Sequence, residues 1–433
     1  MENYFGTDGI RGEYGKTLTT DLAFSVGNAL TQIKKRPNVI IGHDTRISGD
    51  ALLLALSSGI VQGGGNVVSV NTIPTAGISY LAKEMKMDFG IIITASHNPP
   101  NYNGVKIFNS DGRKLSVSEE NFLEEFFKNN FLSSTPGKFT ENKNLQSHYI
   151  KHLCNSIDTK LDDLKICIDA SNGAAYSIGP KVFNMLGATV YKTACQNDGS
   201  KINCQCGSLH IENLIKKVLS TKSQIGFAYD GDADRVIAVD ENGTVFDGDK
   251  LLYILATYMK EQGTLYANSV VGTSHTNSGI MVGLNHHKIN LIRTDIGDKY
   301  VIEAMEKMNL SLGGEQSGHI IIREMSQTGD GILTSLKICE IIKKTGKTLS
   351  ELFDAKITPQ TNINMLVKDK IKILNNEGLN NLINKIISET SPAGRVMVRA
   401  SGTEDLIRIM VELPQKSKAD FYANQIKKYI EKI

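Results

Sequence analysis

Three carboxylates stand close together in the middle of the chain. Residues 230–235 read Asp-Gly-Asp-Ala-Asp-Arg, so only small residues separate Asp230, Asp232 and Asp234. Carboxylates this close repel one another by roughly several kcal/mol per pair at an effective dielectric of about 20, and a bound cation relieves the repulsion. Oxygen ligands select a hard divalent ion, and Mg²⁺ completes its shell with phosphate or water. The motif predicts a magnesium site, on an extended strand or in a tight loop.

Two other interpretations of the acidic segment remain open. It could be an acidic surface turn or a Ca²⁺-binding loop. An EF-hand loop ends in a glutamate at about its twelfth position, and Glu241 stands there. The two flanking helices of that motif are missing from the pattern, so a magnesium site is the preferred interpretation.

A serine follows an apolar run near position 90. Residues 89–94 read Phe-Gly-Ile-Ile-Ile-Thr, which predicts a buried strand, and Ala-Ser-His-Asn-Pro follows at 95–99. At the end of such a strand Ser96 could be an exposed nucleophile whose polar neighbours position a group attached to it. An ordinary Asn-Pro turn is the alternative. A Ser-His pair alone is a weak signal, because adjacent side chains on a strand face opposite ways.

Two further segments have the composition of ligand-binding loops. Residues 399–404 read Arg-Ala-Ser-Gly-Thr-Glu, with Arg408 beyond them; hydroxyls and guanidinium groups together match phosphate, and a hairpin turn is the alternative. Residues 313–319 read Gly-Gly-Glu-Gln-Ser-Gly-His, where Glu315 and Ser317 could bind sugar hydroxyls. This segment could equally be a polar loop with a structural histidine. An ion site, a nucleophile, a phosphate site and a polyol loop together favour phosphoryl transfer.

Buried strands must alternate with helices to position these loops. Short apolar runs end in the polar segments, and helical spacing lies between them, as at 21–33, 51–62, 178–186 and 250–260. This alternation predicts α/β layers, in which ligands gather at the carboxyl ends of strands. The polar stretch 129–146 predicts a surface excursion near the end of a first domain.

The overall composition excludes several classes of protein. The 433 residues carry 48 Lys plus Arg and 46 Asp plus Glu, a net charge of +2, which does not favour nucleic-acid or membrane-surface binding. The six cysteines are too few for a disulfide scaffold, and Cys195, Cys204 and Cys206 lack the spacing of a zinc site. No apolar run approaches the roughly 20 residues of a membrane helix, and no basic leader opens the chain. We therefore expect a cytoplasmic protein with no nucleic-acid or membrane partner.

Five motifs in series resemble those of the α-D-phosphohexomutases across essentially the whole chain. They stand at residues 6–12, 94–99, 230–235, 314–319 and 399–408. Within that superfamily the chain is most similar to the bacterial phosphoglucosamine mutases, through residues 4–12, residues 202–208 and a sugar loop that reads Gly-Glu-Gln-Ser-Gly-His. Phosphomannomutase/phosphoglucomutase relatives usually carry methionine in place of that glutamine.

The resemblance implies a fold with three similar mixed-sheet α/β domains and a smaller C-terminal α+β domain around a central cleft. Together with the composition of the chain it suggests these boundaries: 1–150 with the phosphoserine loop, 151–248 with the metal loop, 249–360 with the sugar loop and 361–433 with the phosphate loop. It implies a small-molecule phosphosugar as partner, and we expect a monomer or homodimer.

The resemblance also implies a mechanism. Ser96 would carry a phosphoryl group, and one Mg²⁺ would be held by that group with the three aspartates. Glucosamine 6-phosphate would become glucosamine 1-phosphate through glucosamine 1,6-bisphosphate as intermediate and activator, supplying UDP-N-acetylglucosamine and cell-wall synthesis. The chain would then be an isomerase that acts by intramolecular phosphotransfer.

Individual roles follow from the matching positions. Lys106 and His319 would handle protons; as a base, Lys106 would need a pKa well below its usual value of about 10.4. The other implied residues are Glu315 and Ser317 for the sugar, Arg399, Ser401, Gly402, Thr403 and Arg408 for the phosphate, and Arg11, His97, Arg235 and Lys299 in support.

The chain departs from the family pattern at three positions. Thr94 replaces a serine, and Ala400 and Asp405 replace a lysine and a proline. One cation fewer and one carboxylate more would weaken phosphate binding by roughly a kcal/mol or two if Asp405 faces the ligand. A phosphomannomutase/phosphoglucomutase, a silent phosphosugar-binding protein and a Mg²⁺-dependent phosphatase remain alternatives.

Overall fold

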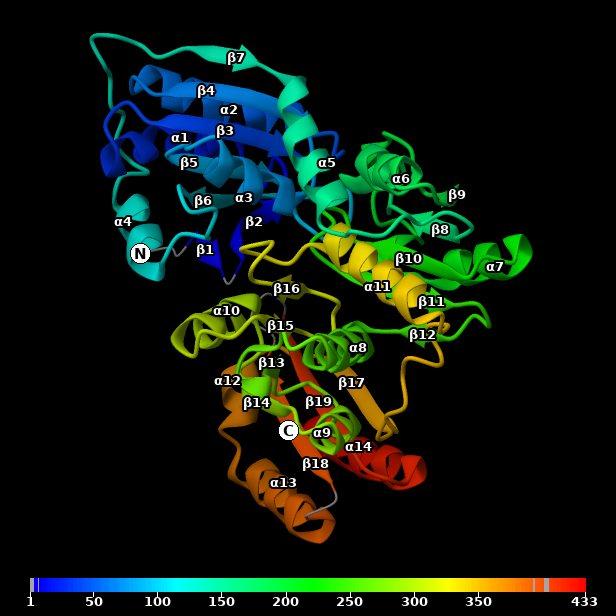
Figure 1. The fold of residues 1–433 in the computed structure, drawn as a ribbon. Helices are drawn as coiled ribbons and strands as arrows, with labels where there is room; N and C mark the ends of the chain where they lie inside the picture. The colour runs from blue at the N-terminus through cyan, green and yellow to red at the C-terminus, as the bar shows by residue number, and fades with distance from the viewer. Residues whose placement is uncertain (1–3, 7, 392–393, 401–404) are drawn as a thin grey trace. The chain divides into compact units, whose positions relative to one another are not determined.

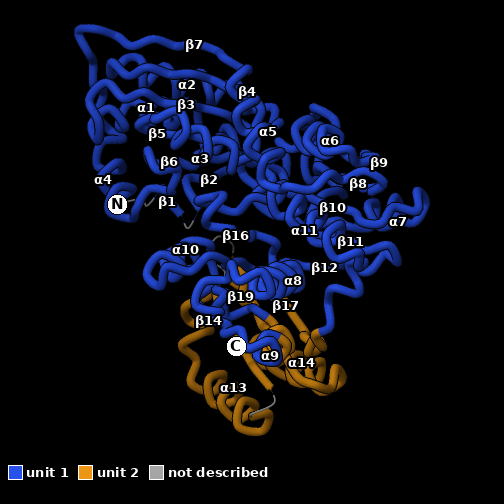
Figure 2. Tube along the Cα trace, in the orientation of Figure 1, with its two compact units in different colours: residues 1–276, 284–354 blue, residues 277–283, 355–433 orange. Residues whose placement is uncertain are grey.

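The computed structural model describes residues 4–6, 8–391, 394–400 and 405–433. Contacts divide the chain into two compact units, coloured separately in Figure 2. Unit 1 comprises residues 1–276 and 284–354, and unit 2 comprises 277–283 and 355–433.

The first sheet of unit 1 has seven strands (Figure 1). In spatial order they are β1 (Phe5–Gly6), β2 (Gly9–Glu13), β6 (Tyr102–Asn109), β5 (Phe89–Ile93), β3 (Asn38–His43), β4 (Asn66–Thr72) and β7 (Phe139–Glu141). Its helices are α1 (Thr20–Ile33), α2 (Gly49–Gln62), α3 (Thr75–Glu84), α4 (Val117–Glu125) and α5 (Gln146–Asn155). Strand β5 is buried throughout, as its unbroken apolar run predicts for a strand covered on both faces. The excursion at 129–146 contributes an edge strand, β7, which the sequence did not predict.

Two more mixed sheets follow in unit 1. The second, in spatial order, contains β12 (Val245–Phe246), β11 (Val236–Asp240), β10 (Ile225–Tyr229), β8 (Lys165–Asp169) and β9 (Thr189–Thr193), with helices α6 (Ala175–Met185) and α7 (Glu212–Thr221). The third contains β14 (Asn290–Thr294), β13 (Ser269–Thr273), β15 (Leu312–Gly314) and β16 (Ile320–Ile322), with helices α8 (Gly248–Glu261), α10 (Asp298–Lys307) and α11 (Gly331–Thr345). Helix α9 (Ser278–His286) begins in unit 2 and ends in unit 1.

The three sheets share one strand order. It runs β4-β3-β5-β6 in the first, β9-β8-β10-β11 in the second and β14-β13-β15-β16 in the third. In each, the first three strands of this series are parallel and the fourth returns antiparallel beside the third. The strand order reverses at β3, β8 and β13, whose next two strands in the chain lie on opposite sides of each. Ligands of open α/β sheets bind at the carboxyl ends of the strands at such a point.

The loop between the third and fourth strand therefore occupies the same position three times. In the first sheet this loop is 94–101 and contains Ser96; in the second it is 230–235 and contains the three aspartates; in the third it is 315–319 and contains Glu315 and His319. The topology thus places three of the chemical motifs in equivalent loops.

Unit 2 contains a smaller antiparallel sheet. Its strands, in spatial order, are β17 (Gln360–Leu366), β19 (Leu406–Glu412) and β18 (Arg395–Ala400), and its helices are α12 (Lys370–Leu374), α13 (Glu377–Thr390) and α14 (Lys416–Ile430). The apolar side chains of β19 alternate into a core that α13 and α14 cover. The prediction of three similar mixed sheets and a smaller C-terminal α+β domain is confirmed.

No helix within the described ranges has both the length and the apolar character of a membrane span. All six cysteines are free thiols.

Candidate active site

Ser96 occupies a constrained turn just after β5. Its φ is +50°, in the left-handed region that serine rarely adopts. The Ser96 N–H donates to Thr94 Oγ1 (3.0 Å), and the Ser96 carbonyl oxygen accepts from Asn203 Nδ2 (2.8 Å). Because the turn ends the strand geometry, Ser96 Oγ lies only 3.3 Å from His97 Nδ1, although the two residues are adjacent in sequence.

Arg46 stabilises this turn through hydrogen bonds to its carbonyl oxygens. The sequence did not assign Arg46 to the site. Its buried guanidinium pairs with Asp44 (2.9 Å) and donates to the carbonyl oxygens of Ser96 (3.0 Å) and Asn98 (2.8 Å). Burial raises the pKa of Asp44, and the charge of Arg46 and a hydrogen bond from Thr94 partly offset the rise. The signal available in the sequence was the polar segment His-Asp-Thr-Arg at 43–46, which directly follows the apolar run at 38–42.

The three aspartates form a buried cluster in a tight loop. One carboxylate oxygen of each lies within 4.8 Å of the others, and Ala233, at φ +57°, turns the backbone between them. Burial, followed by the charges of Asp234 and Asp232, raises the pKa of Asp230 well above its usual range. Among the described residues, Oδ1 of Asp232 and Oδ1 of Asp234 are buried without a hydrogen-bond partner.

These residues fit a hard divalent cation. The cluster offers only oxygen atoms, and the two unpartnered oxygens are available as ligands. Ser96 Oγ donates to Asp230 Oδ2 (2.6 Å), so the candidate nucleophile borders the cluster directly. Gly231 makes this approach possible, because a Cβ there would lie 2.5 Å from the Ser96 carbonyl oxygen.

Lys106 lies on the other side of the aspartates. Its ammonium is buried and donates to Asp232 Oδ2 (2.8 Å) and Asp234 Oδ2 (3.0 Å), and it lies 3.0 Å from Asp8 Oδ2. Burial lowers the pKa of Lys106, but the three carboxylates outweigh burial and raise it well above its usual value. With its pKa raised in this way, the lysine is a charged ammonium that holds its proton tightly and can stabilise negative charge nearby.

His319 faces the same cluster from the third loop. Its Nδ1 lies 3.7 Å from Asp234 Oδ2, and its Nε2 accepts the Gly329 N–H (3.0 Å). In the neutral ring the proton is therefore on Nδ1, directed toward Asp234. Burial lowers the pKa of His319, but Asp234, Asp298 and Glu315 outweigh burial and raise it.

Gly329 packs against the face of this ring. A Cβ at Gly329 would lie 2.5 to 2.6 Å from three His319 ring atoms, so Gly329→Ala should displace the imidazole. His319 is a predicted proton-handling residue, and small misplacements of such a group are costly, so we expect kcat to fall by roughly tenfold or more. Overpacking should also cost about 1–3 kcal/mol of stability, measurable as a lower Tm.

Gly179→Ala in α6 is the matched control for this substitution. The nearest atom to a Cβ at Gly179 lies 3.7 Å away, so kcat should stay unchanged. Helix stability should rise by up to about 1 kcal/mol. A Gly329→Ala protein with the wild-type kcat would show that catalysis does not depend on the position of this ring.

Two arginines act on the His97 ring beside Ser96. Arg11 Nη1 donates to Asn98 Oδ1 (3.2 Å), and Arg235 Nε lies 3.9 Å from Asp234 Oδ1. Burial, with Arg235 and Arg11 nearby, lowers the pKa of His97 to about 3, so this ring is neutral at pH 7. The structure thus brings three of the four predicted supporting residues together beside Ser96, where they would attract an anion.

The sugar loop divides into a buried and an exposed part. Glu315 is buried and its Oε1 accepts the Gly297 N–H (3.0 Å), whereas Ser317 is exposed. The antiparallel bridge between Arg235 and His319 joins this loop to the metal loop. Lys299, the fourth predicted supporting residue, lies in the first turn of α10 and is partly exposed; its charge acts on Glu120 of α4.

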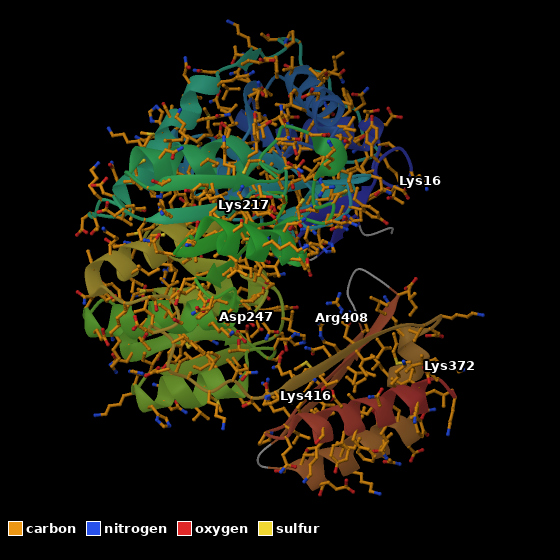
Figure 3. The ribbon with its side chains drawn as sticks, turned by 90° about the vertical axis from the view of Figure 1, so that its right-hand side faces the viewer. Lys16, Lys217, Asp247, Lys372, Arg408 and Lys416 are labelled. Atoms are coloured by element: carbon orange, nitrogen blue, oxygen red, sulfur yellow. The ribbon has the colours of Figure 1, made fainter. Side chains whose placement is uncertain are left out.

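The predicted phosphate residues belong to unit 2. Arg399 on β18 and Arg408 on β19 are direct cross-strand partners, so the two cations share one face of the sheet; Figure 3 labels Arg408. Like charges placed opposite one another destabilise a sheet, and a bound anion would relieve this. Ser401, Gly402 and Thr403 lie outside the described residues. The Asp405 side chain is 80% exposed and lies 3.4 Å from the Lys370 ammonium.

Sequence reasoning left several residues of this site unassigned. Asp8 stands in the motif at 6–12, which carried a signal, but Lys114, Asp298 and Thr75 carried none. Thr75 Oγ1 donates to Asp232 Oδ2 (2.6 Å), and the Lys114 ammonium contacts both Asp8 and Asp298.

Four family models match the chain in series. They describe the α/β/α domains I, II and III and the C-terminal domain of phosphoglucomutase/phosphomannomutase, at residues 2–133, 147–243, 247–359 and 363–428. The chain therefore belongs to the phosphoglucomutase/phosphomannomutase family, a family of phosphohexomutase enzymes.

Individual relatives narrow the comparison further than the family models do. The phosphoglucosamine mutase of Caldanaerobacter subterraneus subsp. tengcongensis is 45% identical over 100% of this chain and 99% of its own length. The phosphoglucosamine mutase of Staphylococcus epidermidis is 40% identical over 100% and 98%. Among solved structures, a phosphoglucomutase/phosphomannomutase family protein from Burkholderia thailandensis has a TM-score of 0.83 at 22% identity, covering 100% of this chain and 98% of its own, which supports the fold.

Proposed function

We propose that this chain is a phosphoglucosamine mutase, which interconverts glucosamine 6-phosphate and glucosamine 1-phosphate through a phosphoserine at Ser96. The observation that carries the proposal is the 2.6 Å contact between Ser96 Oγ and the buried aspartate cluster. Full-length relatives named phosphoglucosamine mutase, at 40 and 45% identity, support the substrate. Phosphosugars are the substrate class of the family.

The aspartates and Ser96 form the reacting end of the proposed site. Asp230, Asp232 and Asp234, with the phosphate on Ser96, would hold one Mg²⁺, which supplies positive charge against the transferring phosphoryl group. Arg11 and Arg235, beside a neutral His97, add to that field. In the forward transfer the bond between phosphorus and Ser96 Oγ breaks as a bond to the sugar oxygen forms, and glucosamine 1,6-bisphosphate results. The second transfer returns the other phosphate to Ser96.

In these transfers a proton must leave the sugar oxygen that accepts the phosphoryl group and return to the sugar oxygen that loses it. We assign Lys106 to this proton handling because its ammonium lies within 3.0 Å of two aspartates of the cluster. His319, with its Nδ1 toward Asp234, is the second proton-handling group. Glu315 and Ser317 would bind sugar hydroxyls, with Lys299 nearby on α10. Arg399, Arg408 and residues 401–403 would bind the phosphate that is not transferring.

The remaining parts of the proposal rest on the sequence and the family. They are the domain boundaries 1–150, 151–248, 249–360 and 361–433, the arrangement of the four domains around a central cleft, a monomeric or homodimeric state and a cytoplasmic location.

Comparing kcat/KM for glucosamine 6-phosphate and mannose 1-phosphate tests the substrate. We expect glucosamine 6-phosphate to be preferred by at least roughly tenfold, which corresponds to about 1.4 kcal/mol of transition-state discrimination. A preference for mannose 1-phosphate would instead make the enzyme a phosphomannomutase. Stoichiometric release of inorganic phosphate would indicate a phosphatase, and no turnover of either sugar a silent binding protein.

A further inference from the structure

Five charged side chains and the imidazole of His319 form a closed ring that includes part of the aspartate cluster. We call it the charge ring; in order it contains Asp234, Lys106, Asp8, Lys114, Asp298 and His319, with acidic and basic groups alternating. Lys106 Nζ lies 3.0 Å from both Asp234 Oδ2 and Asp8 Oδ2, and His319 lies 3.7 Å from Asp234 Oδ2 and 3.8 Å from Asp298 Oδ2. The Lys114 ammonium contacts Asp8 and Asp298 and closes the ring.

The ring connects distant parts of unit 1. Asp8 lies between β1 and β2, Lys114 follows β6 in the first sheet, and Asp298 begins α10 beside the third sheet. The six side chains are between 1 and 20% exposed, so water screens these charges little. Lys114 is the member farthest along the ring from the aspartate cluster, since its two ring partners are Asp8 and Asp298.

Lys114 is connected to both proton-handling groups through one carboxylate each. Asp8 joins it to Lys106, and Asp298 joins it to His319. The backbone beside Asp298 also reaches the sugar loop, because the Gly297 N–H donates to Glu315 Oε1 (3.0 Å). A shift of Asp298 would therefore move the surroundings of His319 and Glu315 together.

We propose that Lys114 is a positioning residue of the mutase: by binding Asp8 and Asp298 at once, it sets the separation of Lys106 and His319. The proposal rests on the proposed function for the roles of those two groups. Without the Lys114 ammonium, Asp8 would keep Arg11 and Lys106 as partners, but Asp298 would lose its lysine. The two carboxylates would no longer be held together by a shared cation and would move apart. The chemical groups would remain, in the wrong geometry.

Lys114→Met tests this proposal, because methionine keeps the length of the side chain and removes its charge. We expect kcat to fall by roughly 100-fold while KM changes by less than about threefold, the pattern of lost positioning in the transition state. Lys114→Arg keeps a cation that can bridge two carboxylates and should recover kcat to within about tenfold of the wild type. Each kcat is referred to folded protein, measured by thermal melting.

Arg113→Met is the matched control. Arg113 is the neighbour of Lys114 and also bonds to α10, through Glu306 (2.9 Å), but this half-exposed pair lies outside the charge ring. We expect kcat to stay within about twofold of the wild type, because an exposed ion pair contributes little. An equal loss of kcat in both variants would overturn the proposal, since it would show that each contact between this loop and α10 matters equally, whether or not it belongs to the charge ring.

The double variant Lys114→Met/Asp298→Asn is measured as well, in case Lys114→Met folds poorly. It removes both charges of the Lys114–Asp298 ion pair and so leaves no unpaired Asp298 carboxylate. If the ring acts as one unit, kcat of the double variant should equal that of the worse single variant within about threefold, rather than show the product of two losses. A Lys114→Met enzyme that retains kcat within threefold would overturn the positioning role while leaving the proposed function intact. If the wild type prefers mannose 1-phosphate, the substrate is wrong and the same variants are compared on that sugar; a wild type that turns over neither sugar overturns both proposals.

Discussion

Ser96→Ala is expected to abolish turnover and to remove a covalent phosphate from the protein. The wild-type chain, purified as the active enzyme, should carry additional mass of about 80 Da, that of one phosphoryl group, and the variant should not. We expect kcat to fall by roughly 10⁴-fold or more, because no other hydroxyl replaces a lost nucleophile. Intact mass spectrometry and the mutase assay measure the two effects separately.

The same substitution should leave the fold intact. Ser96 Oγ donates one hydrogen bond to Asp230, and its loss should cost about 1 kcal/mol of stability. Ser57→Ala is the control, because the buried Ser57 Oγ on α2 has no hydrogen-bond partner among the described residues. That variant should keep both the phosphate and the activity. A Ser96→Ala protein that still gains the phosphate would move the acceptor to another side chain and contradict the proposed function.

Asp232→Asn is expected to produce the second largest loss, through the metal. Asp232 contributes a buried, unpartnered Oδ1 to the cluster, and an amide oxygen is a weaker ligand for a hard divalent ion than a carboxylate. We expect kcat to fall by roughly 10³-fold at moderate Mg²⁺, the order of effect seen when one electrostatic stabiliser is removed. Chelation of the wild type should abolish activity, and added Mg²⁺ should restore it.

Thermal melting separates this effect from a loss of folding. An ion that binds only the folded protein at about 100 times its Kd stabilises it by about 2.7 kcal/mol, so Mg²⁺ should raise the wild-type Tm. Asp232→Asn should show little or no rise, and its Tm without metal should also fall, because the buried Lys106 ammonium loses a carboxylate partner at 2.8 Å. Asp163→Asn, at an exposed position with φ +68° where asparagine is well tolerated, makes the same charge change and should leave the metal response unchanged. Full activity in the presence of a chelator would contradict a metal role for the cluster.

Much of the site could be predicted because its chemistry is concentrated in short segments. The aspartates of residues 230–235 and the turn at 94–99 each follow an apolar run that forms a buried strand, β10 or β5. Local hydrophobicity determines where such buried strands form. The polar residues that follow them must then lie at the carboxyl ends of the strands. The family motifs assigned candidate roles to most of the other residues.

The sequence could not show that three of these loops are equivalent. It contains no evident short repeat, yet the strand order is the same in all three sheets of unit 1. Strand order depends on pairing between segments far apart in the chain, and different apolar side chains satisfy the same pairing. The repetition is therefore visible in topology and absent from local composition.

Ion pairs between segments far apart in the chain could not be predicted from the sequence either. Lys114 lies 106 residues from Asp8 and 184 from Asp298, and no local pattern marks any of the three as partners. For Lys106 the sequence left the direction of the pKa change open, since burial and neighbouring charges act in opposite senses. The direction follows from the carboxylates of Asp232, Asp234 and Asp8 around its ammonium.

The sequence by itself determined which side chains could carry the reaction and that Ser96 and the three aspartates stand in loops after strands, because those properties depend on residue type and local hydrophobic pattern. The tertiary structure of unit 1 decided that Ser96 contacts Asp230, that Lys106 is held as an ammonium and that Lys114 closes a ring of alternating charges. Electrostatic interactions depend on distance and burial in three dimensions, and neither can be read from the order of residues along a chain.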